Sequence, residues 1–254
     1  MFPKLSDMES DWYKKWATLI GQGPIEHRKQ WEYFALLEEL SNRNVLFNGA
    51  KGAGFGVANE PVIPALVHCG CKLMVGDYFP SNKFNSQETK HHLHALNDSI
   101  CSWEQFDESV LYENVDMNKI PDHYTNCDFV WSCCSLEHIG GLEKSKQFIV
   151  NSLRCLKPTG IAVHTTEFNL SSSTDTIDFP DLCAFRVSDL EDVAQRTEEI
   201  GWSMVPIEYN LGNSSRDWGH ISERSIPTET LPHTKIRICG FTLTSILLTF
   251  LPKA

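Results

Sequence analysis

Residues 45–60 read VLFNGAKGAGFGVANE, a short apolar run followed by four glycines within eight positions. Glycine adopts positive φ angles and lets the backbone touch a bound group, so a strand that leads into such a turn and then a helix is typical of nucleotide-binding sites. The sequence therefore predicts a strand at 44–47 with a glycine turn after it. The G-x-G-x-G pattern of Gly52, Gly54 and Gly56 does not identify the nucleotide, but it is no P-loop, because no Gly-Lys-Ser/Thr follows.

The composition is that of a single globular α/β domain. The chain has 254 residues, of which 41% are hydrophobic, and this is enough for one large core. Its net charge of -11 argues against unspecific binding to nucleic acid or to anionic membranes, because both attract basic surfaces. The most apolar stretch, 241–252, is too short to span a membrane and predicts a core strand.

The cysteines and the N-terminal sequence favour a cytoplasmic location. Nine cysteines, an odd number without regular spacing, favour a reducing compartment over a disulfide framework. The first residues, MFPKLSDMESDW, have no basic segment followed by an apolar one, so no signal peptide is predicted.

Apolar runs alternate with amphipathic segments along the chain. Strands alternating with helices of ordinary length form a parallel sheet that is covered on both faces and binds ligands at the carboxyl ends of its strands. The expected fold is therefore α/β, a doubly wound, mostly parallel sheet of seven strands. Further strands are predicted at 72–76, 109–116, 128–131 and 160–166, and helices at 27–40, 60–70, 86–101, 142–156 and 188–200.

Acidic and polar residues stand where these strands end. Asp77 closes the strand at 72–76, where a carboxylate can accept hydrogen bonds from ribose hydroxyls, so an adenosine-containing ligand is favoured. A nicotinamide dinucleotide stays possible on this residue alone. Three further segments then follow in order: NVDMNKIP at 114–121, CDFVWSCCSLEHI at 127–139 and SLRCLKPTGIAVHTT at 152–166.

As a set, these segments resemble the successive motifs of class I S-adenosylmethionine-dependent methyltransferases, in the branch that acts on small molecules. The resemblance covers roughly residues 40–170 and implies a Rossmann-like methyltransferase fold with S-adenosyl-L-methionine as cofactor. It also implies the contacts of that cofactor. Gly52, Gly54 and Gly56 would border its methionine part, Asp77 would hold the ribose, Asp116 would lie beside the adenine amino group with Met117 packed on the ring, and Ser132 and Cys133 would line the remaining wall.

The sequence departs from the family at the glycine turn. Members usually carry an acid two residues before the first glycine, and here Phe47 or Ala50 stands there, depending on which glycine is counted first. Glu60, at the start of the next helix, could replace this acid and bind the ligand's ammonium group. Alternatively, an acid stands there only because the helix dipole favours negative charge in the first turn. The sequence leaves both interpretations open.

Methyl transfer from a sulfonium is an in-line displacement, for which a protein supplies alignment and, where the acceptor must lose a proton, a base. The candidate catalytic residues are His138, His164 and Glu167, at or near the ends of the fourth and fifth predicted strands. Histidines at such places are also often structural, and His164 can instead face the layers that cover the sheet. The histidines of the predicted helix at 86–101 lack metal-ligand spacing, so no metal site is predicted.

Two long polar segments, 168–186 and 210–234, are expected to be either lids over the site or disordered insertions. The second contains the candidate acceptor-binding residues Arg216, Asp217, Trp218 and His220. Methyltransferases that act on exocyclic amines typically end the fourth strand with an Asn/Asp/Ser-Pro-Pro-aromatic turn, and this chain has SCCS there. A small molecule, lipid precursor or sugar is therefore the favoured acceptor, and nucleic acid is disfavoured.

The resemblance predicts one methyltransferase domain over 1–254, with a helical cover at 1–40, a cofactor-binding core at 41–170 and acceptor loops within 171–254. Two alternatives stay open. A binding subunit that keeps the fold without turnover is favoured by the missing acid at the turn. A nicotinamide-dependent oxidoreductase would share the glycines and Asp77, but it would give no reason for the motifs at 114–139. The oligomeric state is not indicated.

Overall fold

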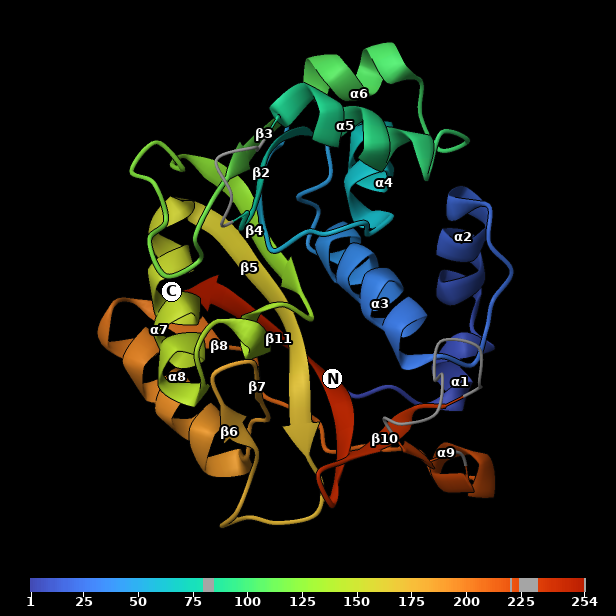
Figure 1. Ribbon diagram of the computed structural model, residues 1–254, viewed down its shortest axis with the longest axis vertical. Coiled ribbons are helices and arrows are strands. Elements are labelled where there is room, and N and C mark those ends of the chain that lie inside the picture. The colour runs from blue at the N-terminus through green and yellow to red at the C-terminus, as the bar shows by residue number, and fades with distance from the viewer. Residues whose placement is uncertain (80–84, 220, 224–232, 254) are drawn as a thin grey trace.

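The computed structural model describes residues 1–79, 85–219, 221–223 and 233–253 (Figure 1). Its main sheet has nine strands in the order β3-β2-β1-β4-β5-β11-β10-β9, and β8 also pairs with β11. The strands are β1 (Lys51–Phe55), β2 (Lys72–Asp77), β3 (Val110–Asn114), β4 (Cys127–Cys133), β5 (Leu156–Asn169), β8 (Trp202–Met204), β9 (Ile221–Glu223), β10 (Lys235–Ile238) and β11 (Phe241–Pro252).

Strands β1 to β5 run parallel to one another, whereas β11 is antiparallel to β5, β8 and β10. The predicted doubly wound, mostly parallel α/β fold is therefore confirmed, and the described residues form nine strands in this sheet in place of seven. The predicted core strand at 241–252 is β11, which lies inside the sheet between β5 and the short strands β8 and β10.

Helices cover both faces of the sheet. In Figure 1, α2, α3 and α4 lie on one side, and α7 and α8 lie on the other. The helices are α1 (Leu5–Met8), α2 (Asp11–Ile20), α3 (Arg28–Asn42), α4 (Val62–His68), α5 (Ser86–Ala95), α6 (Trp103–Ser109), α7 (Leu142–Ser152), α8 (Val187–Glu199) and α9 (Ser215–Gly219). None of the described helices is both long and apolar enough to cross a bilayer.

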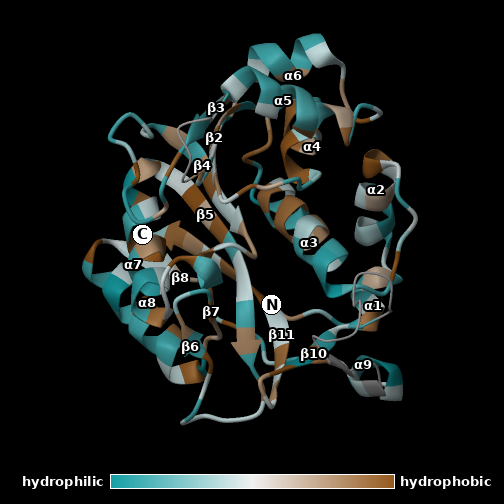
Figure 2. Cartoon of the chain, in the orientation of Figure 1, coloured by the Kyte–Doolittle hydropathy of each residue, from teal (hydrophilic) through white to brown (hydrophobic). Residues whose placement is uncertain are grey.

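The alternation of side chains along the central strands produces two cores. Phe129 and Trp131 of β4 join the core beneath α3 and α4, whereas Val130 between them joins the core beneath α7 and α8. Strand β5 repeats the pattern with Ile161 and Ala162. Because both faces are buried, these strands read as continuous apolar runs. In Figure 2, α5, α6 and α8 are largely hydrophilic, whereas β5 is hydrophobic in its middle and more hydrophilic toward its carboxyl end.

The prediction of a first strand at 44–47 is wrong. Residues 45–47 have no regular structure, and the strand β1 begins at Lys51, so that it contains Gly52 and Gly54. A Cβ atom at Gly52 would lie 2.4 Å from the Phe129 ring, and one at Gly54 would lie 2.3 Å from the Trp131 ring. These two glycines therefore make room for the aromatic side chains of the neighbouring strand, and they do not form a turn.

Part of the segment at 168–186 forms regular secondary structure. Strand β5 continues to Asn169, and β6 (Asp178–Phe179) and β7 (Leu182–Cys183) then form a two-stranded hairpin. The turn of this hairpin contains Pro180 and Asp181, and it lies against the ends of the central strands.

Candidate functional site

A cavity of about 510 Å³ lies where β1, β2 and β4 end. Its walls come from the loops after β1, β2, β3 and β4 and from the turn of the β6–β7 hairpin. Five of the residues that the sequence predicts for a functional site line it: Gly56, Asp77, Asp116, Met117 and His138. Parallel strands present their carboxyl ends at one edge of the sheet, and this explains why residues so far apart in the sequence meet here.

The turn after β1 brings bare backbone to the cavity. Gly56 has a φ of 62°, and a Cβ atom there would lie 2.5 Å from the side chain of Ser135. Only glycine fits such a position without strain. Ala58, two residues later, also has a positive φ, of 38°, and it lines the cavity as well.

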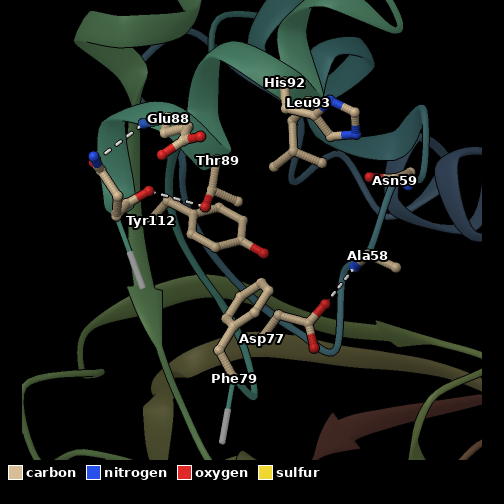
Figure 3. A pocket seen from close by; sticks show the side chains of 10 residues that line it. Ala58, Asn59, Asp77, Phe79, Glu88, Thr89, His92, Leu93 and Tyr112 are labelled. Carbon is tan, nitrogen blue, oxygen red and sulfur yellow. Dashed lines mark hydrogen bonds between the residues drawn. The ribbon is translucent and has the colours of Figure 1, made fainter. Parts of the chain in front are cut away.

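Asp77 ends β2 and is fixed by two backbone hydrogen bonds. Its Oδ2 accepts from the amide of Ala58 at 3.0 Å, and its Oδ1 accepts from the amide of Tyr78 at 2.8 Å. Each carboxylate oxygen has two lone pairs, so both can accept a further hydrogen bond from a ligand. Asp77 also borders a second cavity of about 520 Å³ beneath α5, whose other walls include His92 and Tyr112 (Figure 3).

Asp116 and Met117 follow β3 and form another wall of the first cavity. Asp116 Oδ1 accepts from the backbone amide of Asn118 at 2.8 Å and from its side-chain amide at 3.1 Å. Met117 is buried and turns its thioether toward Gly56. The wall therefore combines a carboxylate with a soft apolar side chain.

His138 stands at the end of a short 3₁₀ helix, Leu136–His138, that follows β4. Its Nδ1 lies 2.6 Å from the backbone carbonyl oxygen of Asp181 in the β6–β7 turn. A carbonyl only accepts hydrogen bonds, so Nδ1 must carry a proton and the neutral ring keeps its lone pair on Nε2. This nitrogen lies 3.8 Å from Glu137 Oε1.

Four predicted cofactor residues do not line this cavity. Gly52 and Gly54 lie within β1, as described above. Ser132 and Cys133 are buried residues of β4, because that strand extends two residues beyond its predicted end. The cavity wall that was expected from them is made by Cys134 and Ser135.

Glu60 does not line the cavity either. Its carboxylate is buried and accepts a hydrogen bond of 2.8 Å from Trp131 Nε1. Burial raises the pKa of Glu60 to about 8, so the carboxyl group is mostly protonated at neutral pH. A protonated, buried acid is a poor partner for an ammonium group.

His164 is a structural residue in the middle of β5. It is fully buried on the α7 side, with Ser132 Oγ 2.8 Å from Nδ1 and Ser152 Oγ 3.2 Å from Nε2. Burial lowers the pKa of His164 to about 3, which keeps the ring neutral. Its side chain points away from the cavity, so it cannot serve as the base there.

Glu167 lies on the opposite face of β5 and meets helix α3. Its Oε1 accepts from Arg28 Nη1 at 2.6 Å and lies 3.5 Å from Lys29 Nζ. Burial opposes ionisation, but the charges of Arg28 and Lys29 outweigh it and lower the pKa of Glu167 to about 2. Glu167 is therefore held as a permanent carboxylate and not as a base that takes up a proton.

Two of the predicted acceptor-binding residues of the 210–234 segment, Arg216 and Asp217, contact the N-terminal part of the chain. Arg216 forms an ion pair with Glu26, and Asp217 Oδ1 accepts from the backbone amide of Leu5 at 2.8 Å. Trp218 lies 4.5 Å from Lys235 Nζ in a cation–π contact. The three residues line neither cavity described above, and His220 lies outside the described residues.

Sequence reasoning missed a group of charged residues on α3. Arg28 and Glu32 are fully buried, and Lys29 lies between them with about a third of its side chain exposed. Charges three and four residues apart on the face of a helix that also carries Trp31 and Leu36 are the signal that could have revealed them.

No protein-family model and no curated protein matches this sequence. The structure does match solved structures. A candidate methyltransferase from Bacillus halodurans superposes with a TM-score of 0.55 at 14% identity, over 86% of this chain and 99% of that one. The methyltransferase domain of a bacterial Hen1 protein gives a TM-score of 0.53 at 9% identity, over 89% of this chain and 100% of that one.

A candidate zinc-dependent alcohol dehydrogenase from Rhodobacter sphaeroides also superposes, with a TM-score of 0.51 at 13% identity, over 96% of this chain and 99% of that one. In two further matches, with TM-scores of 0.49, this chain spans only 60% and 57% of the other chains. At such identities the comparisons establish the fold, and activity has to be argued from the site.

Proposed function

Because this chain has the fold of class I S-adenosylmethionine-dependent methyltransferases, we propose that it transfers a methyl group from S-adenosyl-L-methionine to a small-molecule acceptor. The observation that carries this proposal is the one cavity in which Gly56, Asp77, Asp116 and Met117 meet. The four residues lie at or just after the carboxyl ends of three different strands, and each has a chemistry that suits this cofactor.

Four features of the cavity support this proposal. Gly56 lines the cavity without a side chain, so the methionine part could approach its backbone closely, and the carboxylate of Asp77 can accept from both ribose hydroxyls. Asp116 accepts from Asn118 through Oδ1, which leaves Oδ2 for the adenine amino group. Tyr78 and Met117 both line the cavity and offer flat and apolar surfaces to the adenine ring. The bound cofactor would supply an electrophilic methyl group on its sulfonium.

His138 is the proposed base for acceptors that must lose a proton. The carbonyl of Asp181 holds its Nδ1 proton, so Nε2 is available to accept one. His138 lines the cavity and about half of its side chain is exposed, so an acceptor can reach it. The β6–β7 hairpin thus acts on the site in two ways, because Pro180 lines the cavity and Asp181 orients the histidine.

One observation favours a second candidate, a subunit that binds the cofactor without turnover. The family's usual acid at the methionine end is missing, and Glu60 cannot replace it because it is buried against Trp131. Such a subunit would bind S-adenosyl-L-methionine through Asp77 and Asp116 and would transfer no methyl group.

Calorimetry with S-adenosyl-L-methionine and S-adenosyl-L-homocysteine tests both candidates. We expect one site that binds both compounds, and turnover of a small hydroxyl or amine acceptor measured as formation of S-adenosyl-L-homocysteine. Binding without turnover on a broad acceptor panel would favour the second candidate. If neither compound bound and NADH fluorescence changed on addition of protein, a nicotinamide-dependent oxidoreductase would replace both, since Asp77 also suits that cofactor.

A further inference from the structure

A buried cluster of charged groups lies next to the cavity, where α3 crosses the ends of β4 and β5. Helix α3 contributes Arg28, Lys29 and Glu32, as described above. The loop after β4 contributes Cys134 and Glu137, and β5 contributes Glu167. Cys134 also lines the cavity, so the cluster and the cavity share a wall. The methyl-transfer proposal assigns no role to this cluster.

Three side chains in the cluster have the chemistry and spacing of metal ligands. Cys134 Sγ lies 2.6 Å from Glu137 Oε1 and 3.7 Å from Glu167 Oε1. One possible ligand atom from each of the three residues lies within 4.8 Å of the other two. Thiolate and carboxylate ligands of a tetrahedral zinc ion are roughly 3.5 Å apart. Cys134 Sγ and Glu137 Oε1 would have to move apart by about 1 Å when an ion replaces the thiol proton that now lies between them.

One carboxylate oxygen in the cluster has no partner. Glu167 is 3% exposed, yet its Oε2 makes no hydrogen bond with the described residues. Buried carboxylate oxygens are usually hydrogen-bonded, so an oxygen without a partner is a position that a ligand or an ordered water can take.

Lys29 now occupies part of this space. Its ammonium contacts Cys134 and lies 3.2 Å from Glu32 Oε1 and 3.5 Å from Glu167 Oε1. With about a third of its side chain exposed, it can turn toward solvent, whereas Arg28 is buried and cannot. Lys29 would therefore compete with a metal ion and would not exclude it.

We propose that Cys134, Glu137 and Glu167 form a binding site for a divalent transition-metal ion such as Zn²⁺. A thiolate with two carboxylates is a ligand set that suits zinc, and calcium and magnesium prefer oxygen ligands alone. Because Cys134 lines the cavity, an ion bound to it would lie beside the cavity, and a fourth position of the ion could open toward it. On the proposed function, that position would take a hydroxyl oxygen of the acceptor and lower its pKa.

Cobalt substitution tests the site without any activity measurement. The protein is stripped with EDTA and titrated with Co²⁺, and a thiolate-to-cobalt charge-transfer band should rise to one equivalent and be bleached by Zn²⁺. Cys134→Ser should abolish the band, and Glu137→Gln or Glu167→Gln should weaken Co²⁺ binding by roughly tenfold or more. Cys69→Ser, which alters a half-buried thiol outside the cluster, is the matched control and should keep the band.

Lys29→Met sharpens the test, since removal of the competing ammonium should tighten Co²⁺ binding. Circular dichroism of each variant shows whether it is folded. The proposal is overturned if the stripped wild-type protein gives no band, if folded Cys134→Ser gives the same band, or if only Lys29→Met binds cobalt. The last result would make Lys29 the resident cation of the cluster. None of these readouts depends on methyl transfer, so failure of the metal site and failure of the proposed function are distinguishable.

Discussion

At the scale of single residues, we expect Asp77 to determine how tightly the proposed cofactor binds. Asp77→Ala removes hydrogen bonds to a charged acceptor that are worth roughly 1.5–3 kcal/mol, so the dissociation constant of S-adenosyl-L-methionine should rise about ten- to a hundredfold. Calorimetry measures it. His92→Ala is the control, because His92 lines the second cavity and not the first. If the dissociation constant is unchanged in the folded Asp77→Ala variant, Asp77 does not bind the cofactor.

His138 should affect turnover and not cofactor affinity. If its Nε2 takes the acceptor's proton, His138→Ala should lower kcat by roughly a hundredfold or more and leave the dissociation constant of the cofactor within a fewfold. Steady-state rates and calorimetry on the same preparation separate the two effects. If His138→Ala turns over as fast as the wild-type protein, His138 is not the base and its role is structural.

His164 should make the protein sensitive to acid. The pKa of this residue is about 3 in the folded protein, well below the value of 6.5 usual for histidine, so the folded state binds fewer protons between these values. Its contribution to stability is complete above pH 6.5 and is lost as the pH falls toward 3, by about 1.4 kcal/mol per pH unit. His164→Gln should show a shallower loss in urea unfolding curves over this range. Parallel curves for the two proteins would contradict this.

Residues that close a strand were easier to predict than residues within one. Asp77, Asp116 and His138 stand next to turns, and the edge at which parallel strands end is fixed by the fold. To predict where the side chains of Ser132 and His164 lie, one must know how long β4 is and which face of the sheet each residue of β5 points to. A strand buried on both faces has no polar side to reveal which residues face which layer, so the sequence alone did not determine them.

At the scale of elements, the packing of β1 against β4 requires glycine at positions 52 and 54, because a larger side chain there would clash with β4. Gly54→Ala places a Cβ atom 2.3 Å from the Trp131 ring, which is part of a packed core and cannot move freely. Such overpacking should lower the free energy of unfolding by about 1–3 kcal/mol or more. Gly23→Ala is the control, because a Cβ atom there meets nothing within 4 Å, and it should change stability by less than about 0.5 kcal/mol. Denaturant unfolding compares the two, and equal stabilities would contradict this account of β1.

The misplaced first strand has a physical cause. The run Val45–Phe47 is apolar and looks like a strand, whereas the actual strand, with its two glycines, does not. Strand propensity follows from side chains that pack on a half-buried surface, and β1 is packed by the side chains of its neighbour β4. Helix α3, which has its own apolar periodicity, was predicted within two residues of its ends.

At the scale of the whole molecule, the 210–219 segment helps to hold the N-terminal segment, whose first residue, Met1, also forms backbone hydrogen bonds with Leu247 of β11. Asp217 accepts from the backbone of Leu5 and also from Ser214, so Asp217→Ala should loosen α1 while Met1 stays paired with β11. Limited proteolysis should then cut near Leu5 several times faster than in wild type. Asp98→Ala, an exposed acid without a hydrogen bond in the described part of the chain, is the control. Identical cleavage rates would show that other contacts hold the segment.

The place of β11 inside the sheet has a consequence for synthesis on the ribosome. Strand β11 covers one edge of β5 from Ala162 to Asn169, and every other strand of the sheet precedes it in the sequence. While a nascent chain still lacks residues 241–252, that edge offers a row of unpaired backbone groups flanked by buried side chains. The half of the sheet from β3 to β5 can therefore form early, but the edge of β5 stays unpaired until residues 241–252 have been synthesised. Chaperone demand should peak in this interval.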